Sequence, residues 1–370
     1  MTNRRNFIKG VSTAALGAIT MPMLSAKVGR HKRIIDEDVI LGHGDYQYKL
    51  QTNWAKMSAV KNPLLNCHEM VMDSKGRLFM LGDHTANNVL IFDKSGKLLD
   101  YWGTQYPGGH GLTISHEGEE DFLYLTDAGW YVNRRGETVR QNGRVTKTDL
   151  DGNVIFDIAH PQTVGAYEPT DYFCPTEVAI APNGDIYIAD GYSTDYILHY
   201  DAKGQFIRKW GGHDNEDENY NIHNAHGVTL DMRDQDNPLL VCSSRNKNEY
   251  KFFTLDGKYV RTLKLPGLYP CRAVIDDDNL YTGICWSKQK DGTMDWQAHS
   301  GFVTVLEGDT VVSNPGGSAP IYKDGQLQPA HQLSTRPIWH GHDVCVDEDK
   351  NLYVCQWNAG HSAPYKLERV

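Results

Sequence analysis

Three histidines in short, similar motifs are the side chains with the clearest capacity for chemistry. They are the central residues of a Gly-His-Gly, an Ala-His-Gly and a Gly-His-Asp tripeptide, at His110, His226 and His342, and each precedes a segment of alternating apolar residues. Three neutral imidazoles on one metal leave a coordination position open for water or substrate, as in catalytic zinc sites. For any one of these histidines, a hydrogen bond to a neighbouring strand would be the simpler explanation. Three histidines in the same sequence context favour a shared zinc ion instead.

Two further residues belong with this group. His68 occupies the same phase in Cys67-His68-Glu69, where it could be a fourth metal ligand, an acid or base lining a channel, or a structural residue. Asp343 directly follows His342 and could turn its carboxylate toward the axis. With the backbone carbonyls of Leu112 and Met70, it would form a hard-oxygen site suited to calcium.

The elements that must position these residues are six copies of one repeat. Each copy has a polar residue or histidine, an alternating apolar segment, a turn and a second apolar segment, then a third segment that commonly ends in Asp-x-x-Gly and a fourth such as 205–210. Period-two alternation with Gly, Asp and Asn at the joints is typical of antiparallel strands and hairpins. The first residues of the copies, the key positions, are His68, His110, Thr176, His226, Arg272 and His342.

Four short strands repeated six times predict an all-β fold, a six-bladed β-propeller. Alternate blades of such a ring are about 120° apart, so the three histidines converge on its axis. The last copy stops one strand short at 365–370, and the segment 46–54 can supply the missing outer strand and close the ring. A β-sandwich would not explain six copies in phase.

The N-terminal segment predicts export. Arg4 and Arg5 precede an apolar run over 11–24, and Ser25-Ala26 ends it. This pattern is typical of a twin-arginine signal, so we expect a periplasmic or secreted protein. The predicted organisation is a signal peptide over 1–26, a lead-in over 27–45 and the propeller over 46–370.

The composition of the chain indicates which classes of partner to expect. The chain has 370 residues with 40% hydrophobic residues and a formal net charge of −10, which argues against binding nucleic acid. No mature segment has 18 consecutive apolar residues, so we expect no membrane span, and we expect a monomer with a small-molecule or peptide substrate. Seven cysteines without a CxxC do not specify a disulfide framework. Most are expected to be buried free thiols.

The blade sequences resemble the propeller of peptidyl-α-hydroxyglycine α-amidating lyase, within the NHL-repeat group, over most of residues 60–370. Besides the histidine motifs, the resemblance rests on 173–178, 184–192, 244–246 and 358–361. It implies that His110, His226 and His342 hold zinc and that Asp343 contributes to a structural calcium site. It also implies that Tyr192 is the catalytic base and Arg245 a substrate-binding arginine. The family's reaction splits a carbinolamide into an amide and glyoxylate.

The chain departs from this family at three places. Gly82-Asp83-His84 stands where the family has a second arginine, His68 replaces a small residue, and Ser193 replaces the cysteine that would pair with Cys174. The interpretation is therefore a zinc-dependent, lyase-like enzyme that cleaves a C–N or C–O bond of a small anionic or peptide-like substrate. Without the resemblance, Tyr192 would be an ordinary packed turn residue and Arg245 an ordinary partner of a neighbouring blade.

Two other functions stay open at this point. One is a lyase or hydrolase acting on a sugar derivative, with tryptophans stacking on sugar rings; the candidates are Trp102, Trp130, Trp286, Trp339 and Trp357. The other is a non-enzymatic NHL-type binding propeller that presents the insertions 131–143 and 287–300 to a partner. A binding module has no need for an open coordination position, so metal content separates these classes.

Overall fold

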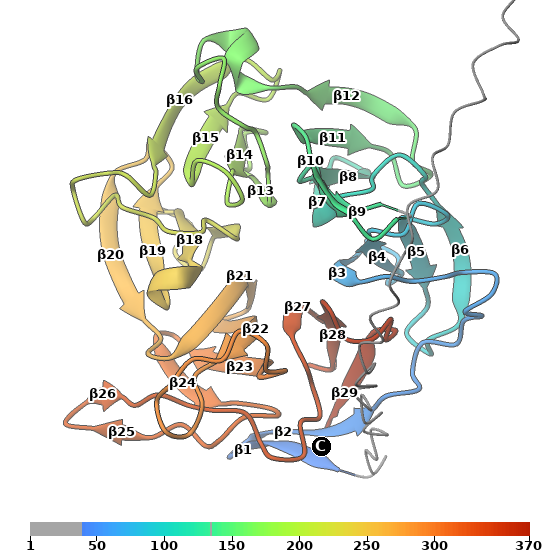
Figure 1. The fold of residues 1–370 in the computed structure, drawn as a ribbon, viewed down its shortest axis with the longest axis vertical. Helices are drawn as coiled ribbons and strands as arrows, with labels where there is room; N and C mark the ends of the chain where they lie inside the picture. Colours follow the sequence, from blue (N-terminus) through green and yellow to red (C-terminus); the bar gives the residue numbers. More distant parts are fainter. Residues whose placement is uncertain (1–38, 134) are drawn as a thin grey trace, which may run out of the picture. The chain divides into compact units, whose positions relative to one another are not determined.

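The computed structural model describes residues 39–133 and 135–370, and it confirms the six-bladed β-propeller (Figure 1). Six antiparallel sheets are arranged around a central axis, and each has its first strand innermost. The predicted signal peptide lies outside the described residues. In the described part, no helix has the length and apolar character needed to cross a bilayer.

The first five blades each contain four strands, named here from the axis outward. Blade 1 comprises β3 (Cys67–Met72), β4 (Leu78–Gly82), β5 (Val89–Phe92) and β6 (Leu98–Trp102). Blade 2 comprises β7 (Gly109–Glu117), β8 (Glu120–Asp127), β11 (Arg144–Thr148) and β12 (Val154–Ile158). Blade 3 comprises β13 (Glu177–Ile180), β14 (Ile186–Ala189), β15 (Tyr196–Tyr200) and β16 (Phe206–Gly211). Blade 4 comprises β17 (Val228–Asp231), β18 (Leu239–Ser244), β19 (Glu249–Thr254) and β20 (Tyr259–Lys264). Blade 5 comprises β21 (Leu268–Asp276), β22 (Asn279–Ser287), β23 (Phe302–Glu307) and β24 (Thr310–Ser313).

The sixth blade closes the ring with strands from both ends of the described chain. It comprises β27 (Gly341–Val346), β28 (Leu352–Gln356), β29 (Tyr365–Arg369), β2 (Tyr46–Gln51) and β1 (Ile40–His43). Pairing of β2 with β29 confirms that the segment beginning at Tyr46 supplies the missing outer strand. The strand β1 adds a fifth member from the segment expected to be a lead-in.

Two hairpins and two short 3-10 turns complete the described structure. The hairpins are β9 (Trp130–Val132) with β10 (Thr138–Arg140), and β25 (Tyr322–Lys323) with β26 (Gln326–Leu327). The 3-10 turns are η1 (Pro161–Val164) and η2 (Arg245–Lys247). The first hairpin and η2 lie on the side of the ring that carries the pocket described below.

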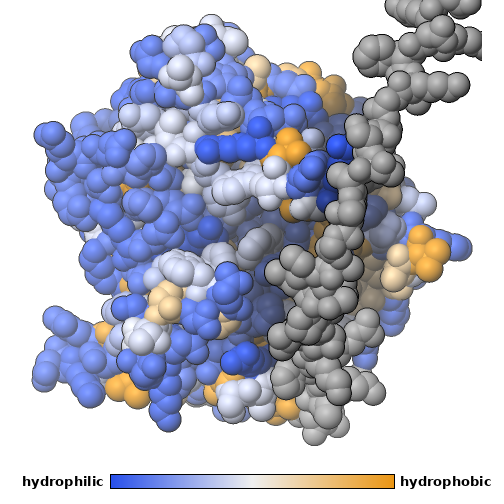
Figure 2. All heavy atoms as spheres, in the orientation of Figure 1, coloured by the Kyte–Doolittle hydropathy of each residue, from blue (hydrophilic) through white to orange (hydrophobic). Residues whose placement is uncertain are grey.

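The hydrophobic core lies between neighbouring blades rather than at one centre. Middle strands such as β14 and β28 are buried on both faces, because each blade packs against the next on either side. All seven cysteines are buried free thiols, as predicted. The face of the ring in Figure 2 is largely hydrophilic, with only scattered hydrophobic residues.

The inner strands are irregular where they carry the key positions. The pairing register shifts around His68, His110, Arg272 and His342. A bulge bends its strand and redirects the side chain that it carries, which here brings the key residues to the axis. Close approach also requires glycine after His226, since a Cβ at Gly227 would lie 2.5 Å from the Cα of Arg272.

Candidate metal centre and substrate pocket

Four histidine rings meet on the axis of the propeller. The ring centroids of His110 and His342 are 4.7 Å apart. His226 lies 4.7 and 4.8 Å from these two rings, and His68 lies 5.0 and 4.9 Å from them. All four side chains are buried. The structure therefore brings together the predicted histidines, including His68.

The outer nitrogens of three of these rings are held by oxygen acceptors. Nδ1 of His110 is 2.8 Å from the carbonyl of Thr176, and Nδ1 of His342 is 2.9 Å from the carbonyl of His68. Nε2 of His68 is 3.4 Å from the carboxylate of Asp83. Each contact requires a proton on that nitrogen, because carbonyls and carboxylates accept hydrogen bonds, so in a neutral ring the lone pair is on the other nitrogen.

The cluster has the chemistry of a metal site. Nδ1 of His68 and Nε2 of His342 are buried without a hydrogen-bond partner in the described part of the protein. Burial, together with the neighbouring histidines and Arg245, lowers the pKa values of His110, His226 and His342 well below the usual range. Neutral imidazoles with unpaired nitrogens are suited to zinc and other first-row transition metals. The residues present therefore fit a metal.

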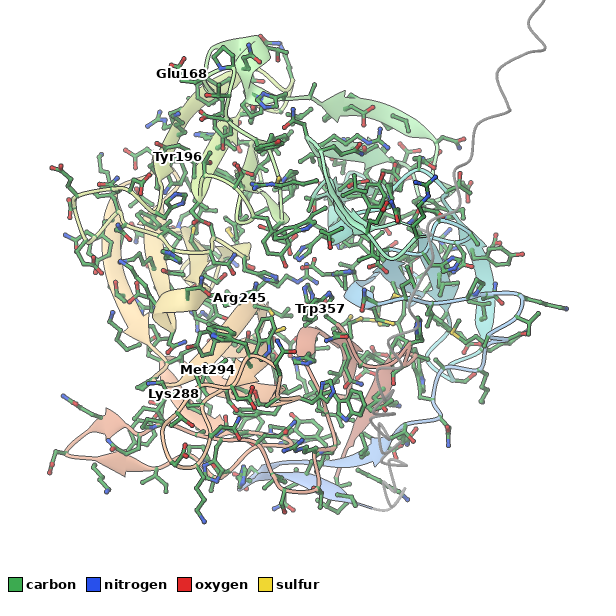
Figure 3. The ribbon with its side chains drawn as sticks, viewed as in Figure 1. Glu168, Tyr196, Arg245, Lys288, Met294 and Trp357 are labelled. Carbon is green, nitrogen blue, oxygen red and sulfur yellow. The ribbon has the colours of Figure 1, made fainter. Side chains whose placement is uncertain are left out.

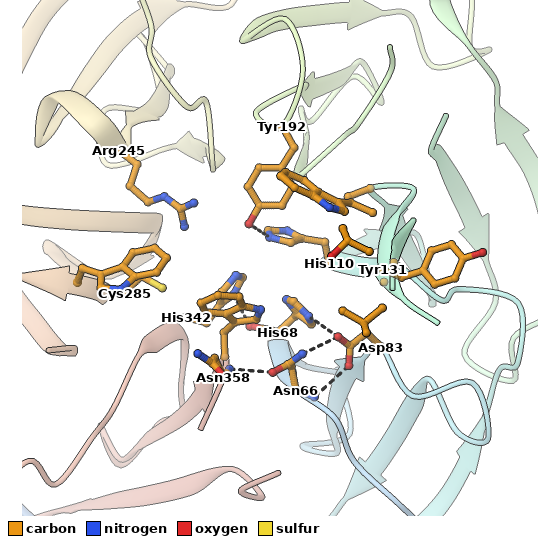
Figure 4. Close-up of a pocket in the computed structure, with 18 residues that line it drawn as sticks. Asn66, His68, Asp83, His110, Tyr131, Tyr192, Arg245, Cys285, His342 and Asn358 are labelled. Carbon is orange, nitrogen blue, oxygen red and sulfur yellow. Dashed lines mark hydrogen bonds and ion pairs between the residues drawn. The ribbon is translucent and has the colours of Figure 1, made fainter. Parts of the chain in front are cut away.

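Tyr192 stands beside this cluster, but in a different state from the expected base. Its hydroxyl oxygen is 3.0 Å from Nε2 of His110 (Figure 4). The same oxygen is 3.2 Å from Nε2 of His226. Burial raises the pKa of Tyr192 to about 12, although Arg245 opposes the shift. The phenol thus carries its proton at neutral pH in this structure.

Arg245 places a positive charge at the wall of the same pocket. It begins η2, is buried, and donates from Nε to the side-chain oxygen of Asn224 at 2.6 Å. Its guanidinium carbon lies 5.9 and 5.5 Å from the ring centroids of Tyr192 and Trp286. No carboxylate in the described ranges forms an ion pair with it. A buried guanidinium without such a partner favours binding of an anionic ligand group.

A pocket of about 500 Å³ lies over the histidine cluster. The indole rings of Trp130, Trp286 and Trp357 contribute to its walls, the first of them from the β9–β10 hairpin. Arg245 and Asp83 lie on opposite sides of the pocket in Figure 4, and Figure 3 places Arg245 and Trp357 near the middle of the ring. The pocket therefore has aromatic walls, a cationic side and an acidic side.

The oxygens assigned to calcium in the sequence analysis are held instead by a guanidinium. Arg272 donates from Nε and Nη2 to the two carboxylate oxygens of Asp343, at 2.8 and 2.9 Å. It also donates to the carbonyls of Leu112 at 2.8 Å and Met70 at 3.1 Å. Asp343 thus faces Arg272, away from the histidines. The fixed charge of Arg272 occupies the place of the expected ion.

Two more buried carboxyl groups surround Arg272. Its Nη1 lies 3.2 Å from Glu69 and 3.7 Å from Glu177. Burial, with repulsion from Glu177 and Asp343, raises the pKa of Glu69 well above its usual range even though Arg272 opposes the shift. Arg272 stands at a key position of the sequence repeat, and no role was predicted for it. The sequence feature that could have indicated a role is its position, because Arg272 occupies the same place in its repeat as the axial histidines do in theirs.

Comparisons with known proteins place the chain among propellers with NHL repeats. It is 27% identical over 178 residues to a probable peptidyl-alpha-hydroxyglycine alpha-amidating lyase of Caenorhabditis elegans, covering 46% of each chain. It is 32% identical over 123 residues to peptidyl-alpha-hydroxyglycine alpha-amidating lyase 1 of Drosophila melanogaster, covering 32% of this chain and 19% of that protein. The matched region thus spans less than half the length of either lyase. No family model matches the sequence.

Similarity to other proteins supports the same fold. NHL repeat-containing protein 3 of Homo sapiens is 24% identical over 244 residues, covering 59% of this chain and 67% of that protein. A streptogramin B lyase structure aligns with a TM-score of 0.51 and 15% identity, covering 90% of this chain and 99% of that one. A gluconolactonase of Xanthomonas campestris aligns with a TM-score of 0.51 and 12% identity, covering 91% and 99%. At these identities, the structural matches show the fold alone.

Proposed function

We propose that this NHL-like propeller is a metal-dependent lyase that cleaves a C–N or C–O bond of a small substrate carrying a carboxylate. The observation that carries the proposal is the buried guanidinium of Arg245, without a carboxylate partner in the described residues, over imidazoles with unpaired nitrogens. The similarity to amidating lyases supports the same reaction class. Export to the periplasm or outside the cell remains part of this proposal.

The pocket residues and the metal have separate roles in the proposed reaction. Arg245 binds the substrate carboxylate and fixes its orientation, and the indole walls exclude water. When bound, the metal supplies Lewis acidity, which lowers the pKa of a substrate hydroxyl. In a carbinolamide, that hydroxyl loses its proton and becomes the carbonyl of glyoxylate, while the C–N bond breaks and the amide nitrogen takes up a proton. Tyr192, whose hydroxyl lies beside His110 and His226, would relay a proton from the substrate hydroxyl to the departing amide nitrogen.

Metal content tests the proposal directly. The purified protein should contain about one transition-metal ion per chain, and His342→Ala should lose it, because that ring contacts all three other histidines of the cluster. His116→Ala is a matched control, since that ring lies on an exposed surface. The measurement is elemental analysis after loading and desalting. Absence of stoichiometric metal in the loaded wild-type protein would contradict the proposal and favour the non-enzymatic binding propeller.

Removal of Arg245 should weaken substrate binding. With N-benzoyl-α-hydroxyglycine as the probe, Arg245→Ala should raise KM roughly 10- to 100-fold, since a charged hydrogen-bonded pair contributes about 1.5–3 kcal/mol. The assay measures release of glyoxylate. The methyl ester of the probe is the control, because it lacks the anion and should react alike with both proteins. An unchanged KM for the acid would show that Arg245 does not bind the carboxylate.

A hydrolase acting on a sugar lactone is a second candidate, and one observation favours it. Three of the five tryptophans considered in the sequence analysis line the pocket, at Trp130, Trp286 and Trp357. Trp102 packs between blades, where its ring would meet a Cβ at Gly152 and its Nε1 donates to Leu150. Lactone opening without release of glyoxylate from the hydroxyglycine probe would favour this candidate over the lyase.

A further inference from the structure

We propose that the substrate is a zwitterion, whose carboxylate binds Arg245 and whose ammonium group binds Asp83 on the opposite side of the same pocket. The inference rests on the proposed function, because it takes the carboxylate site at Arg245 from there. It adds the class of substrate, a short aminoacyl compound with a free amine. The charge of Asp83, its place in the pocket and the aromatic wall beside it support the inference.

Asp83 carries a negative charge that no lysine or arginine of the described ranges neutralises. It directly follows β4, and its side chain is 17% exposed and lines the pocket. Its oxygens accept hydrogen bonds from the backbone and the side-chain nitrogen of Asn66, at 2.9 and 2.7 Å, and Oδ2 is 3.4 Å from Nε2 of His68. Neither an amide nor a neutral imidazole carries a charge. The carboxylate is therefore held in place while its negative charge stays available to a cationic ligand group.

Two opposite charges thus face one cavity without neutralising each other. Arg245 has no carboxylate partner among the described residues, no ion pair joins it to Asp83, and the two lie on opposite sides of the pocket (Figure 4). A ligand that displaces water from this pocket leaves an uncompensated charge on one side if it carries only one charge itself. A ligand with an anionic and a cationic end pairs both.

A series of contacts connects the two charges along one wall of the pocket. The guanidinium carbon of Arg245 lies 5.5 Å from the ring centroid of Trp286, which is 5.6 Å from that of Trp357. The backbone nitrogen of the next residue donates to the side-chain oxygen of Asn66 at 2.7 Å, and Asn66 holds Asp83. The wall between the charges is therefore aromatic, and the face of an indole ring attracts an ammonium group.

The proposed reaction separates the two ends of such a substrate. In an aminoacyl-α-hydroxyglycine, the carboxylate is attached to the carbon that bears the hydroxyl, and the ammonium group lies beyond the C–N bond that breaks. Transfer of the hydroxyl proton to the amide nitrogen yields glyoxylate and an aminoacyl amide. Arg245 then holds the anionic product and Asp83 the cationic one, so both halves are positioned by charge throughout the cleavage.

The test compares two probes that differ only at the amine. Glycyl-α-hydroxyglycine has the ammonium group, and N-acetylglycyl-α-hydroxyglycine lacks it. From glyoxylate release, the wild-type kcat/KM should favour the free amine roughly 10-fold, because a charged hydrogen bond forms at a partly exposed side chain. The preference should fall to within roughly twofold in Asp83→Asn and should be retained in large part in Asp83→Glu, which keeps the charge.

Asp185→Asn is the matched control. Asp185 is 18% exposed and pairs with a histidine, His199, at 2.8 Å, as Asp83 pairs with His68, but it belongs to blade 3 and does not line the pocket. Its variant should keep the wild-type preference. The ratio of the two probes also separates substrate binding from an effect transmitted through His68, because a disturbed histidine would slow both probes by the same factor. Thermal unfolding shows whether each variant is folded.

Binding of unreactive analogues separates this inference from the proposed function. Calorimetric titration with glycylglycine and N-acetylglycylglycine, which lack the hydroxyl group, measures the same preference without turnover. Tighter binding of glycylglycine to the wild type and not to Asp83→Asn, with no cleavage of either hydroxyglycine probe, would support the zwitterion site and contradict the lyase. Cleavage of both probes with no preference for the amine, or a preference that survives in Asp83→Asn, would overturn the inference and leave the lyase standing.

Discussion

Replacement of Arg272 by alanine should lower the free energy of unfolding by about 3–5 kcal/mol. This guanidinium is buried and contacts Asp343, Glu69 and Glu177, none of which is more than slightly exposed. It also satisfies the carbonyls of Leu112 and Met70. Without it, three acidic groups share one buried space with no cation, and removal of one partner from such a cluster is strongly destabilising.

Urea unfolding measures this effect, and Arg208→Ala is the control. Arg208 is an exposed arginine that donates to the backbone carbonyl of Asp256, so its removal should change the free energy of unfolding by less than about 0.5 kcal/mol. An Arg272→Ala protein as stable as the control variant would show that the carboxyl cluster does not depend on this charge.

Added calcium should affect the wild-type protein and Arg272→Ala differently. The wild-type melting temperature should not respond to calcium or to a chelator through this site, because Arg272 already holds the oxygens. In Arg272→Ala the freed carboxylate and carbonyl oxygens match the ligands that calcium prefers, so millimolar calcium should restore part of the lost stability. A variant that responds to calcium no more than the wild type would show that the emptied space cannot hold the ion.

The fold could be predicted from the sequence because the signal is repeated. Each copy alone, such as 177–200, is a series of short, ambiguous apolar segments. Six copies in phase specify blades, and a missing outer strand specifies closure by Tyr46–Gln51. The convergence of His68, His110, His226 and His342 follows from the same phase. It does not depend on knowing any contact in detail, which is why it could be predicted.

Which side chains contact one another inside the channel could not be predicted in the same way. The sequence placed Arg272 at a key position, but whether its guanidinium turns toward Asp343 or toward the histidines depends on how the inner strands bulge. Similarly, Asp83 contacts His68 only because the end of β4 lies beside the start of β3. Such contacts join side chains from different strands, and residue spacing within a single strand carries no information about them.

Removal of the Tyr192 hydroxyl should reduce kcat for the hydroxyglycine probe roughly 100- to 10,000-fold, the range for loss of a positioned proton-transfer group. Tyr192→Phe keeps the ring that packs against His110 and Arg245, so metal content and KM should change little. Tyr131→Phe is the matched control, because Tyr131 lines the same pocket and its hydroxyl forms no hydrogen bond to a histidine in the described part of the protein. Loss of metal in Tyr192→Phe would identify the phenol as a ligand, whereas an unchanged kcat would remove it from the reaction. A low kcat with metal and KM preserved would place the proton transfer at the Tyr192 oxygen, since binding alone could not account for that combination.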